Sequence, residues 1–427
     1  MPATDRALLI GCHGGVGRAL LAALEHTTPG QAVLASLDAL LLADREPPDA
    51  PRPANAIGTL LPPVVIESAD DLGRLARDHA ITQVVDVSSI DTVDCTQACD
   101  SLGADFLCTS VEEWSGQPPL PTDEAIARLL PPRRPVLERR SHLVGSGANP
   151  GIVNALVFTA IEEFARRVDV APTVEALEIE SILITEEDTT TETGASASTD
   201  VFPMTWSPLH CLEELFEPAA FCARDGRVES LGHAPTARWY RARCGDRVID
   251  GMAVPHEEVA TLARRLPTVE IAFLYRIAPA AIETLAAHAG APPPATCTTH
   301  RLCPPWATAL TGRDRVGVLL GSRRFGELWQ GFDTDVATGL ALGTNATQLQ
   351  VAAGIVAGWS QLGRRKGIHF VENLDCAQFV DVATAVLGPL VVVHDPDARP
   401  RPLADRAVPP PAGAASAHAA VRTRLAD

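Results

Sequence analysis

The chain has 427 residues, 46% of them hydrophobic, and its 53 acidic and 35 basic residues give a formal net charge of −18. This length favours two domains, because a single hydrophobic core rarely grows beyond about 250–300 residues. The acidic surplus argues against a nucleic-acid partner, which requires a basic face, and favours cationic small molecules. No apolar run approaches the roughly 20 residues that span a bilayer and no signal peptide is recognisable, so we expect a cytoplasmic protein without a membrane partner.

The ten cysteines include no CxxC pair. The closest set, Cys297, His300 and Cys303, lacks a second pair of ligands for zinc. The sequence therefore predicts reduced thiols and no metal site.

The first 145 residues alternate between strand-like and helix-like segments. We expect strands at 7–10, 32–37, 64–66, 83–87 and 105–108, with helices at 17–24, 70–79 and 91–102. Such alternation is typical of an α/β fold, here a doubly wound parallel sheet of the Rossmann type spanning residues 1–148.

A glycine-rich loop follows the first predicted strand and precedes the first predicted helix. It comprises Gly11, Gly14, Gly15, Val16 and Gly17. Glycines at such a turn let the backbone approach a pyrophosphate, which the N–H groups at the helix start then stabilise. We therefore predict a dinucleotide site; the alternative is a tight turn that binds nothing.

Asp38 is predicted to end the second strand, 21 residues after Gly17. A carboxylate there would bind the ribose hydroxyls of NAD and repel the 2′-phosphate of NADP. Arg45 lies near enough in sequence to leave NADP open as an alternative.

The pattern changes after residue 148. A helix at 151–166 and strands at 176–184, 238–244, 248–254, 268–277, 315–320 and 324–332 predict a second α+β domain, 149–344, on an open and largely antiparallel sheet. A helix at 345–358 begins a C-terminal helical segment, 345–394, that is expected to return to the first domain. The Pro/Ala-rich tail, 395–427, is expected to be mobile beyond about residue 400.

Carboxylates gather around one tryptophan within residues 184–214. Glu186, Glu187 and Asp188 precede Trp206, and Glu214 follows it. A tryptophan face attracts an organic ammonium, and carboxylates accept its N–H groups. The alternative is a solvated acidic loop with one anchoring tryptophan, since the intervening polar run is too poor in apolar residues to predict a packed element.

Several separated motifs occur in a fixed order over roughly residues 5–392. They are Glu112 and Trp114 in TSVEEW, Asn149 and Pro150 in GANPG, Glu186 and Asp188 in EEDT, Trp206 in TWS, His256 and Glu258 in HEE, Asn345 and Thr347 in NAT, and Leu387-Gly388-Pro389. Together they resemble bacterial homospermidine synthase, within the saccharopine dehydrogenase-like group.

The resemblance implies a polyamine enzyme that is both transferase and oxidoreductase and uses bound NAD. A primary diamine such as putrescine would be oxidised to an imine, a second amine would displace ammonia, and the same hydride would reduce the new Schiff base. The resemblance also implies a homodimer.

It further implies roles for individual residues. Glu186 would pair with an ammonium group, and Trp206 would hold a cationic intermediate. Glu112 and His256 would be further polar partners, the histidine shuttling a proton if its pKa is near neutral. Asn149, with Pro150, would orient cofactor or substrate. Glu214 and Glu258 occupy the remaining acidic positions. Two alternatives stay open, a simple helix start at Asn149 and a surface location for His256.

Departures from the family pattern cluster in the amine-binding segment. Met204 replaces an asparagine, Glu187 a basic residue, and Ala220 an acidic one. They leave the amine unspecified and keep open a saccharopine dehydrogenase-like reductase that condenses an amine with a carbonyl compound and consumes NAD(P)H. That enzyme would need a cation for a substrate carboxylate, for which the candidates are Arg18, Arg139, Arg140, Arg276, Arg323 and Arg324. A third alternative is a nucleotide sensor without turnover.

Overall fold

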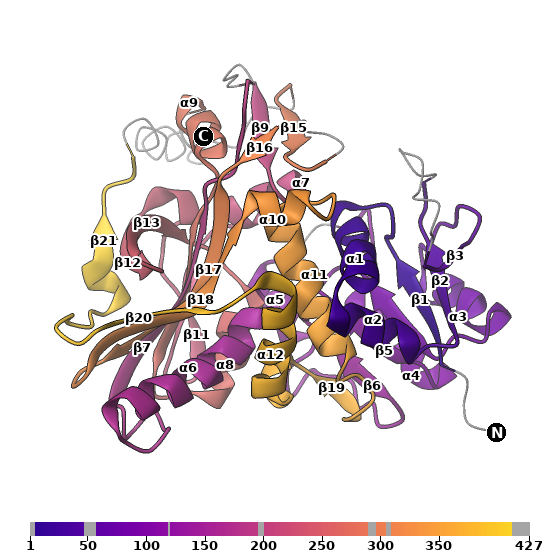
Figure 1. Ribbon diagram of the computed structural model, residues 1–427, viewed down its shortest axis with the longest axis horizontal. Coiled ribbons are helices and arrows are strands. Elements are labelled where there is room, and N and C mark those ends of the chain that lie inside the picture. The colour runs from indigo at the N-terminus through magenta and orange to yellow at the C-terminus, as the bar shows by residue number, and fades with distance from the viewer. Residues whose placement is uncertain are drawn as a thin grey trace, which may run out of the picture. The chain divides into compact units, whose positions relative to one another are not determined.

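The computed structural model describes residues 5–46, 57–117, 120–194, 200–288, 296–304 and 309–411. The chain forms two compact units. The first comprises Met1–Ala155, Leu342–Thr344 and Gln348–Gly388, and the second Leu156–Ala341, Asn345–Thr347 and Pro389–Asp427. Each unit contains a large sheet of its own (Figure 1).

The first unit is built on a seven-stranded sheet in the order β19-β6-β5-β4-β1-β2-β3. Its strands are β1 (Arg6–Ile10), β2 (Ala39–Ala43), β3 (Thr59–Leu60), β4 (Gln83–Asp86), β5 (Asp105–Cys108), β6 (Ser141–Leu143) and β19 (Gly367–His369). Neighbouring strands all run parallel. Leu8, Val84 and Phe106 are fully buried, as expected for a parallel sheet covered on both faces. The predicted Rossmann-type sheet is confirmed.

The first unit contains the following helices, some of which begin at polar caps. They are α1 (Gly15–His26), α2 (Thr28–Ala35), α3 (Ala69–Asp78), α4 (Thr92–Leu102), α5 (Thr122–Ala127), η2 (Val371–Asn373) and α12 (Cys376–Leu387). Ser68 caps α3 by accepting a hydrogen bond from the Asp71 N–H, and Asp91 caps α4 in the same way. Gly103 then ends α4 in a left-handed conformation that favours glycine.

Two predicted strands are wrong. Residues 32–37 lie largely in helix α2, which Thr27 caps and in which Pro29 occupies the first turn. Residues 64–66 form no strand. Because α2 fills the place of the predicted second strand, the real one is β2, and Asp38 precedes it.

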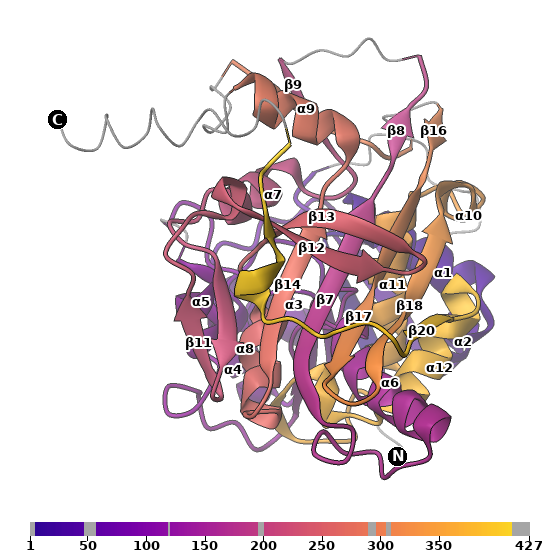
Figure 2. The ribbon, with the colours of Figure 1, turned by 90° about the vertical axis from the view of Figure 1, so that its left-hand side faces the viewer.

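The second unit is built on a ten-stranded sheet, along which β20-β18-β17-β7-β14-β13-β12-β21 are successive neighbours (Figure 2). Within it β7 and β14 run parallel and the other pairs are antiparallel, which confirms a largely antiparallel sheet. The strands are β7 (Ile179–Asp188), β10 (Phe221–Arg224), β11 (Arg227–Ser230), β12 (Trp239–Cys244), β13 (Arg247–Ala253), β14 (Glu270–Arg276), β17 (Arg313–Ser322), β18 (Gly326–Asp335), β20 (Val391–Asp395) and β21 (Ala407–Val408).

Smaller elements complete this unit. Two strand pairs join β9 (Val201–Met204) to β15 (Thr298–Arg301) and β8 (Thr191–Glu192) to β16 (Leu310–Thr311). The helices are α7 (Pro208–Leu215), η1 (Pro235–Ala237), α8 (Glu257–Arg265), α9 (Pro279–Ala287), α10 (Val336–Leu340) and η3 (Leu403–Arg406). Two further helices, α6 (Ile152–Val168) and α11 (Ala346–Trp359), contribute residues to both units.

The two faces of the β7–β17–β14 region differ in chemistry. On one face Leu183, Leu319 and Trp329 pack into an apolar cluster with residues of β12, which lies against β7 and β17 (Figure 2). The other face carries Glu186 and Asp188 near the end of β7, because side chains alternate along a strand. The acidic side chains therefore project away from the apolar cluster.

The start of the C-terminal tail is ordered, contrary to prediction. Leu403 is fully buried, Arg406 forms an ion pair with Glu327, and β21 adds to the sheet beside β12. Residues 412–427 lie outside the described part of the chain. The start of the tail is ordered because Leu403 and Arg406 are buried, which the composition of the tail does not reveal.

All ten cysteines are free thiols, as predicted. None of the helices in the described ranges is long and apolar enough to cross a membrane.

Candidate active site

In the glycine loop of the first unit, backbone segments lie too close together for ordinary side chains. A Cβ on Gly17 would lie 2.2 Å from the Gly11 carbonyl oxygen, so this position accepts no side chain, and one on Gly15 would lie 2.3 Å from Nε2 of Gln348, whose side chain would have to move. Gly14 begins helix α1 without a side-chain cap. The first N–H groups of α1 therefore suit an anionic group such as a pyrophosphate.

Asp44, rather than Asp38, lies beside this loop. The Asp38 N–H donates to the carbonyl of Asp5, which precedes β1, so Asp38 is at the amino edge of the sheet. Asp44 directly follows β2 at the carboxyl edge, and its Oδ2 accepts the His13 N–H at 2.8 Å. The predicted location of Asp38 at a strand end is wrong, because helix α2 lengthens the connection between the loop and the carboxyl end of β2.

Glu112 follows β5, and a buried carboxylate that the sequence analysis missed ends neighbouring β4. The hydroxyl of Ser110 donates to Oε1 of Glu112 at 2.7 Å. Burial raises the pKa of Asp86 to about 7 in spite of hydrogen bonds from Ser88, and the charge of Glu112 adds to this shift. A carboxylate as the last residue of a buried parallel strand was the available signal, since ligands bind at this edge of such sheets.

Asn149 and Pro150 belong to a tight loop that precedes α6. The Gly147 N–H donates to the Pro150 carbonyl, and a Cβ on Gly151 would lie 2.1 Å from the Gly147 oxygen. Helix α6 begins only at Ile152. Pro150 thus lies outside the first helical turn, and the alternative of a simple helix start at Asn149 is wrong.

In the second unit, β7 continues through Asp188, beyond the predicted strand 176–184, so the alternative of a solvated acidic loop is wrong for residues 185–188. Across the sheet Glu186 pairs with Tyr275 of β14, and Asp188 pairs with Asp314 of β17. Glu186, Asp188 and Asp314 are all buried. Their alternation with Glu187 gives one strand two chemically different faces.

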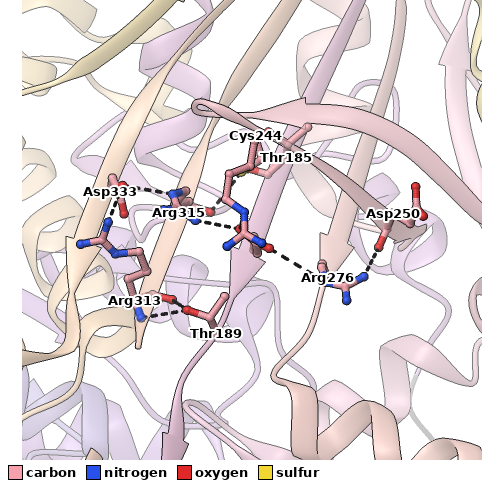
Figure 3. Close-up of polar contacts among 10 residues, drawn as sticks. Thr185, Thr189, Cys244, Asp250, Arg276, Arg313, Arg315 and Asp333 are labelled. Atoms are coloured by element: carbon pink, nitrogen blue, oxygen red, sulfur yellow. Dashed lines mark hydrogen bonds and ion pairs between the residues drawn. The ribbon is translucent and has the colours of Figure 1, made fainter. Parts of the chain in front are cut away.

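Glu187 projects to the face opposite Glu186. Its Oε2 accepts a hydrogen bond from Nη1 of buried Arg315 at 2.8 Å, and Asp333 accepts another from Nε of the same guanidinium at 3.0 Å. Figure 3 shows Arg315 beside Asp333, with Arg276 and Asp250 farther along the sheet. The charge reversal at Glu187 is therefore compensated on its own face and does not alter the face of Glu186.

Trp206 is held by a phenol of the sheet. Its indole Nε1 donates to the Tyr275 hydroxyl at 3.2 Å. Burial, with the nearby charges of Glu186 and Asp188, raises the pKa of Tyr275 well above its usual range, so the phenol stays neutral. Because Tyr275 and Glu186 are register partners, Trp206 and Glu186 belong to the same neighbourhood of this unit.

His256 lies among three carboxylates and immediately precedes α8. Its Nδ1 is 2.5 Å from Oε2 of buried Glu258 and 3.6 Å from Glu257, and its Nε2 is 4.0 Å from Glu214. Burial by itself would lower the pKa of His256, but the three carboxylates outweigh it and raise the pKa to about 10. A surface location and a near-neutral pKa are therefore both wrong, and the imidazole is a cation at neutral pH.

The pKa of Glu214 is also raised. Burial raises its pKa well above the usual range, and the neighbouring Glu257 adds to the effect, although His256 opposes it. Donor atoms of His256, Glu257 and Glu258 also lie within 4.8 Å of one another, but the short bond between His256 and Glu258 is an internal ion pair that explains this grouping.

The predicted residues thus fall into two groups. The second unit brings together Glu186 with Trp206, and His256 with Glu214 and Glu258. Glu112, Asn149 and the glycine loop belong to the first unit. Chemically, the glycine loop of the first unit suits an anionic dinucleotide, and the acidic residues of the second unit suit an organic cation.

Comparison with known proteins identifies the fold. No protein-family profile matches the chain, and no curated sequence matches it significantly. A homospermidine synthase from Legionella pneumophila, solved in complex with NAD, is 19% identical over 92% of both chains, with a TM-score of 0.76. The L-glutamate-forming saccharopine dehydrogenase of Saccharomyces cerevisiae, solved without ligand, is 12% identical over 91% of this chain and all of that one, with a TM-score of 0.50. The chain therefore has a homospermidine synthase-like fold.

Proposed function

We propose that the protein is an NAD-dependent amine-coupling enzyme of the homospermidine synthase type. It would oxidise a diamine to an imine, let a second amine displace ammonia, and reduce the resulting Schiff base with no net redox change. The observation that carries the proposal is the acidic face of β7, where Glu186 lies in register with the phenol that holds Trp206. A shared fold over 92% of a homospermidine synthase supports it.

The residues of the first unit fit a dinucleotide. The glycines leave the start of α1 open to a pyrophosphate, and Asp44 would accept the ribose hydroxyls while repelling the 2′-phosphate of NADP. NAD, when bound, would supply a hydride acceptor and donor. Glu112 and Asp86, at the carboxyl ends of neighbouring strands, would provide polar contacts at the same edge.

The second unit would hold the amine. An alkyl ammonium has a pKa of about 10.4, like lysine, so the substrate arrives charged at neutral pH. The Trp206 face would attract this cation, and Glu186 would accept its N–H groups. Tyr275 keeps the indole oriented through its hydrogen bond.

His256 would exchange protons with substrate nitrogens. Its pKa of about 10 is close to that of an alkyl ammonium, so proton transfer in either direction is nearly balanced in energy. Glu258 would keep the imidazolium oriented through the bond to Nδ1, leaving Nε2 as the atom that gives or takes the proton.

The test is turnover of putrescine. The protein is incubated with NAD⁺ and putrescine from about pH 7 to about pH 10, where both amine protonation states are sampled, and products are identified by mass spectrometry. We expect homospermidine and ammonia in equal amounts. Absence of product at every pH would exclude putrescine as the substrate.

The reductase alternative needs a free cation for a substrate carboxylate. Arg276 donates to the Asp250 carbonyl and lies 4.0 Å from Glu187, and Arg323 pairs with Glu178. These interactions weigh against Arg276 and Arg323 as that cation. Stoichiometric loss of NADH absorbance with an aldehyde present would favour it, and cofactor binding without any turnover would favour a sensor.

A further inference from the structure

Four buried side chains of the second unit form a continuous hydrogen-bonded chain. Oδ2 of Asp314 is 2.5 Å from Oγ1 of Thr347, which is 2.9 Å from Oγ1 of Thr205, which is 2.8 Å from Oδ2 of Asp188. The two aspartates are also direct partners on neighbouring strands β17 and β7. The chain thus closes a loop between two adjacent carboxyl groups.

Counting hydrogens shows that this chain needs one more proton than its hydroxyls carry. It contains three oxygen–oxygen contacts of hydrogen-bond length, but Thr205 and Thr347 supply only one hydroxyl hydrogen each. If both aspartates were ionised, each threonine would donate to its own carboxylate, and their oxygens would face each other without a hydrogen. A third hydrogen, on one carboxyl group, satisfies all three contacts in one direction.

We propose that Asp188 and Asp314 share a single proton through Thr347 and Thr205, and that this one-proton chain positions Trp206 for the amine substrate. The second part rests on the proposed function. The proton resides mainly on Asp314, because Oδ1 of Asp188 also accepts the Thr190 N–H at 2.7 Å, which stabilises the ionised form of Asp188.

The surroundings favour this protonation state. Burial raises the pKa of Asp188, and burial together with the charges of Glu186 and Asp188 raises that of Asp314 well above its usual range. The titratable groups acting on the pair or near it are Glu186 and Glu187 of β7, Tyr275 of β14, Asp333 of β18 and Cys211 of α7. Glu187 and Asp333 are paired with Arg315, and the other three groups are acids or weak acids that disfavour a second negative charge.

The hydrogen-bonded chain can position Trp206 because Thr205, one of its members, directly precedes Trp206. The Thr205 hydroxyl is fixed by the chain, and its carbonyl oxygen accepts a hydrogen bond from Nδ2 of Asn345 at 2.6 Å. The next residue then donates its indole N–H to Tyr275. We therefore assign Asp188, Asp314 and Thr347 as positioning residues, which act on the amine through Trp206.

Asparagine substitutions test the proton count. In Asp314→Asn the amide N–H donates to Thr347 as the protonated carboxyl does, so the chain survives. In Asp188→Asn the amide donates to Thr205, and the chain reverses to end on an ionised Asp314. In Thr347→Val the central hydroxyl is lost and the chain is broken, whereas Thr347→Ser keeps the hydroxyl. The proposal therefore predicts that both asparagine variants and Thr347→Ser are tolerated and that Thr347→Val is not.

Three readouts follow the chain without requiring turnover. Thermal unfolding measures the stability of each variant, infrared difference spectra detect loss of one protonated carboxyl group in either asparagine variant, and indole hydrogen exchange by NMR reports on Trp206, assigned with Trp206→Phe. We expect faster Trp206 exchange in Thr347→Val alone. An asparagine variant that loses no protonated carboxyl group, or that exchanges as fast as Thr347→Val, would overturn the proposal.

Turnover separates this proposal from the proposed function. If putrescine is coupled, the two asparagine variants and Thr347→Ser should keep kcat within a few-fold, and Thr347→Val should lose about a hundredfold in kcat, as expected for a misplaced site, with a smaller change in KM. If kcat falls equally in the asparagine variants and in Thr347→Val, Trp206 positioning by a shared proton is wrong. If no amine reacts but each asparagine variant loses the protonated carboxyl group and Thr347→Val alone exchanges faster, the shared proton stands while the enzymatic function fails.

Discussion

At the scale of single residues, Asp38 and Asp44 flank the same strand at opposite ends. Asp38 hydrogen-bonds the residue before β1, whereas Asp44 accepts the N–H of His13 in the glycine loop. The sequence spacing selected Asp38, and the register of β2 against β1 selects Asp44. In a Rossmann sheet the carboxyl edge binds the cofactor, so only Asp44 is in a position to do so.

We therefore expect Asp44→Asn to weaken NAD binding by about tenfold or more, since hydrogen bonds to a charged group contribute about 1.5–3 kcal/mol. Asp38→Asn is the matched control and should leave affinity unchanged. Titration of the cofactor, followed by fluorescence or calorimetry, measures both. The opposite pattern, with NAD affinity lowered in Asp38→Asn and unchanged in Asp44→Asn, would show that Asp38 binds the cofactor.

His256 makes a pH-dependent contribution to stability whose sign follows from its raised pKa. The pKa rises from an ordinary 6.5 to about 10 in the folded protein. The folded state therefore binds this proton more tightly, and the stabilisation is complete below about pH 6.5 and is lost as the pH rises through about 10. His256→Gln should be less stable than the unsubstituted protein by a few kcal/mol at pH 6, with the gap closing toward alkaline pH. Denaturant unfolding across this range is the measurement, and a gap that widens with pH would contradict it.

At the scale of elements, the two faces of β7 assign two separate roles to adjacent acidic residues. Glu187 pairs with Arg315, whose side chain is 7% exposed, whereas the pair of Arg323 and Glu178 has an arginine that is 69% exposed. Removing one partner of a buried ion pair leaves an uncompensated charge, while a surface pair contributes little.

We expect Arg315→Met to destabilise the fold by about 3 kcal/mol or more, and the control Arg323→Met by about 1 kcal/mol or less. Neither should change KM for the amine, because Glu187 does not share the face of Glu186. Urea unfolding and steady-state kinetics measure the two effects. A raised KM in Arg315→Met, measured where the variant is fully folded, would show that Glu187 does affect amine binding.

Element prediction succeeded for the long patterns and failed for some of the short ones. Helices 70–79 and 91–102 and the hairpin of β17 and β18 were evident from periodicity and caps. Residues 32–37 were misassigned because a short apolar run fits a strand or a buried helix equally well, and the capping Thr27 and Pro29 decided for the helix. The end of β7 was missed because it is polar, and its stability comes from pairing with β14 and β17 rather than from its own residues.

At the scale of the whole molecule, the candidate site was predictable only in part. Glu186, Trp206 and His256 belong to motifs that can be recognised locally. Asp314 was not predicted, and Thr347 was part of the NAT motif but received no role, because both meet Asp188 only through the register of β17 and the start of α11, which are 126 and 159 residues away in sequence. Long-range pairing of this kind leaves no local signal.

The two units divide the proposed chemistry between an anion-binding loop and an acidic amine site, and the net charge of −18 favours encounter with cationic substrates. The claim that connects the two is that the hydride taken from one amine returns to the coupled product. A reductase would instead use hydride from the solution pool of reduced cofactor.

The most direct measurement uses putrescine deuterated at its nitrogen-bearing carbons, with unlabelled NADH added to the solution. Oxidation moves one deuterium away as hydride, and return of that same hydride restores it to the carbon that forms the new C–N bond. If the same hydride returns, homospermidine should retain every deuterium, with no net change in NADH absorbance. A product in which one deuterium is replaced by hydrogen, accompanied by consumption of NADH, would contradict it.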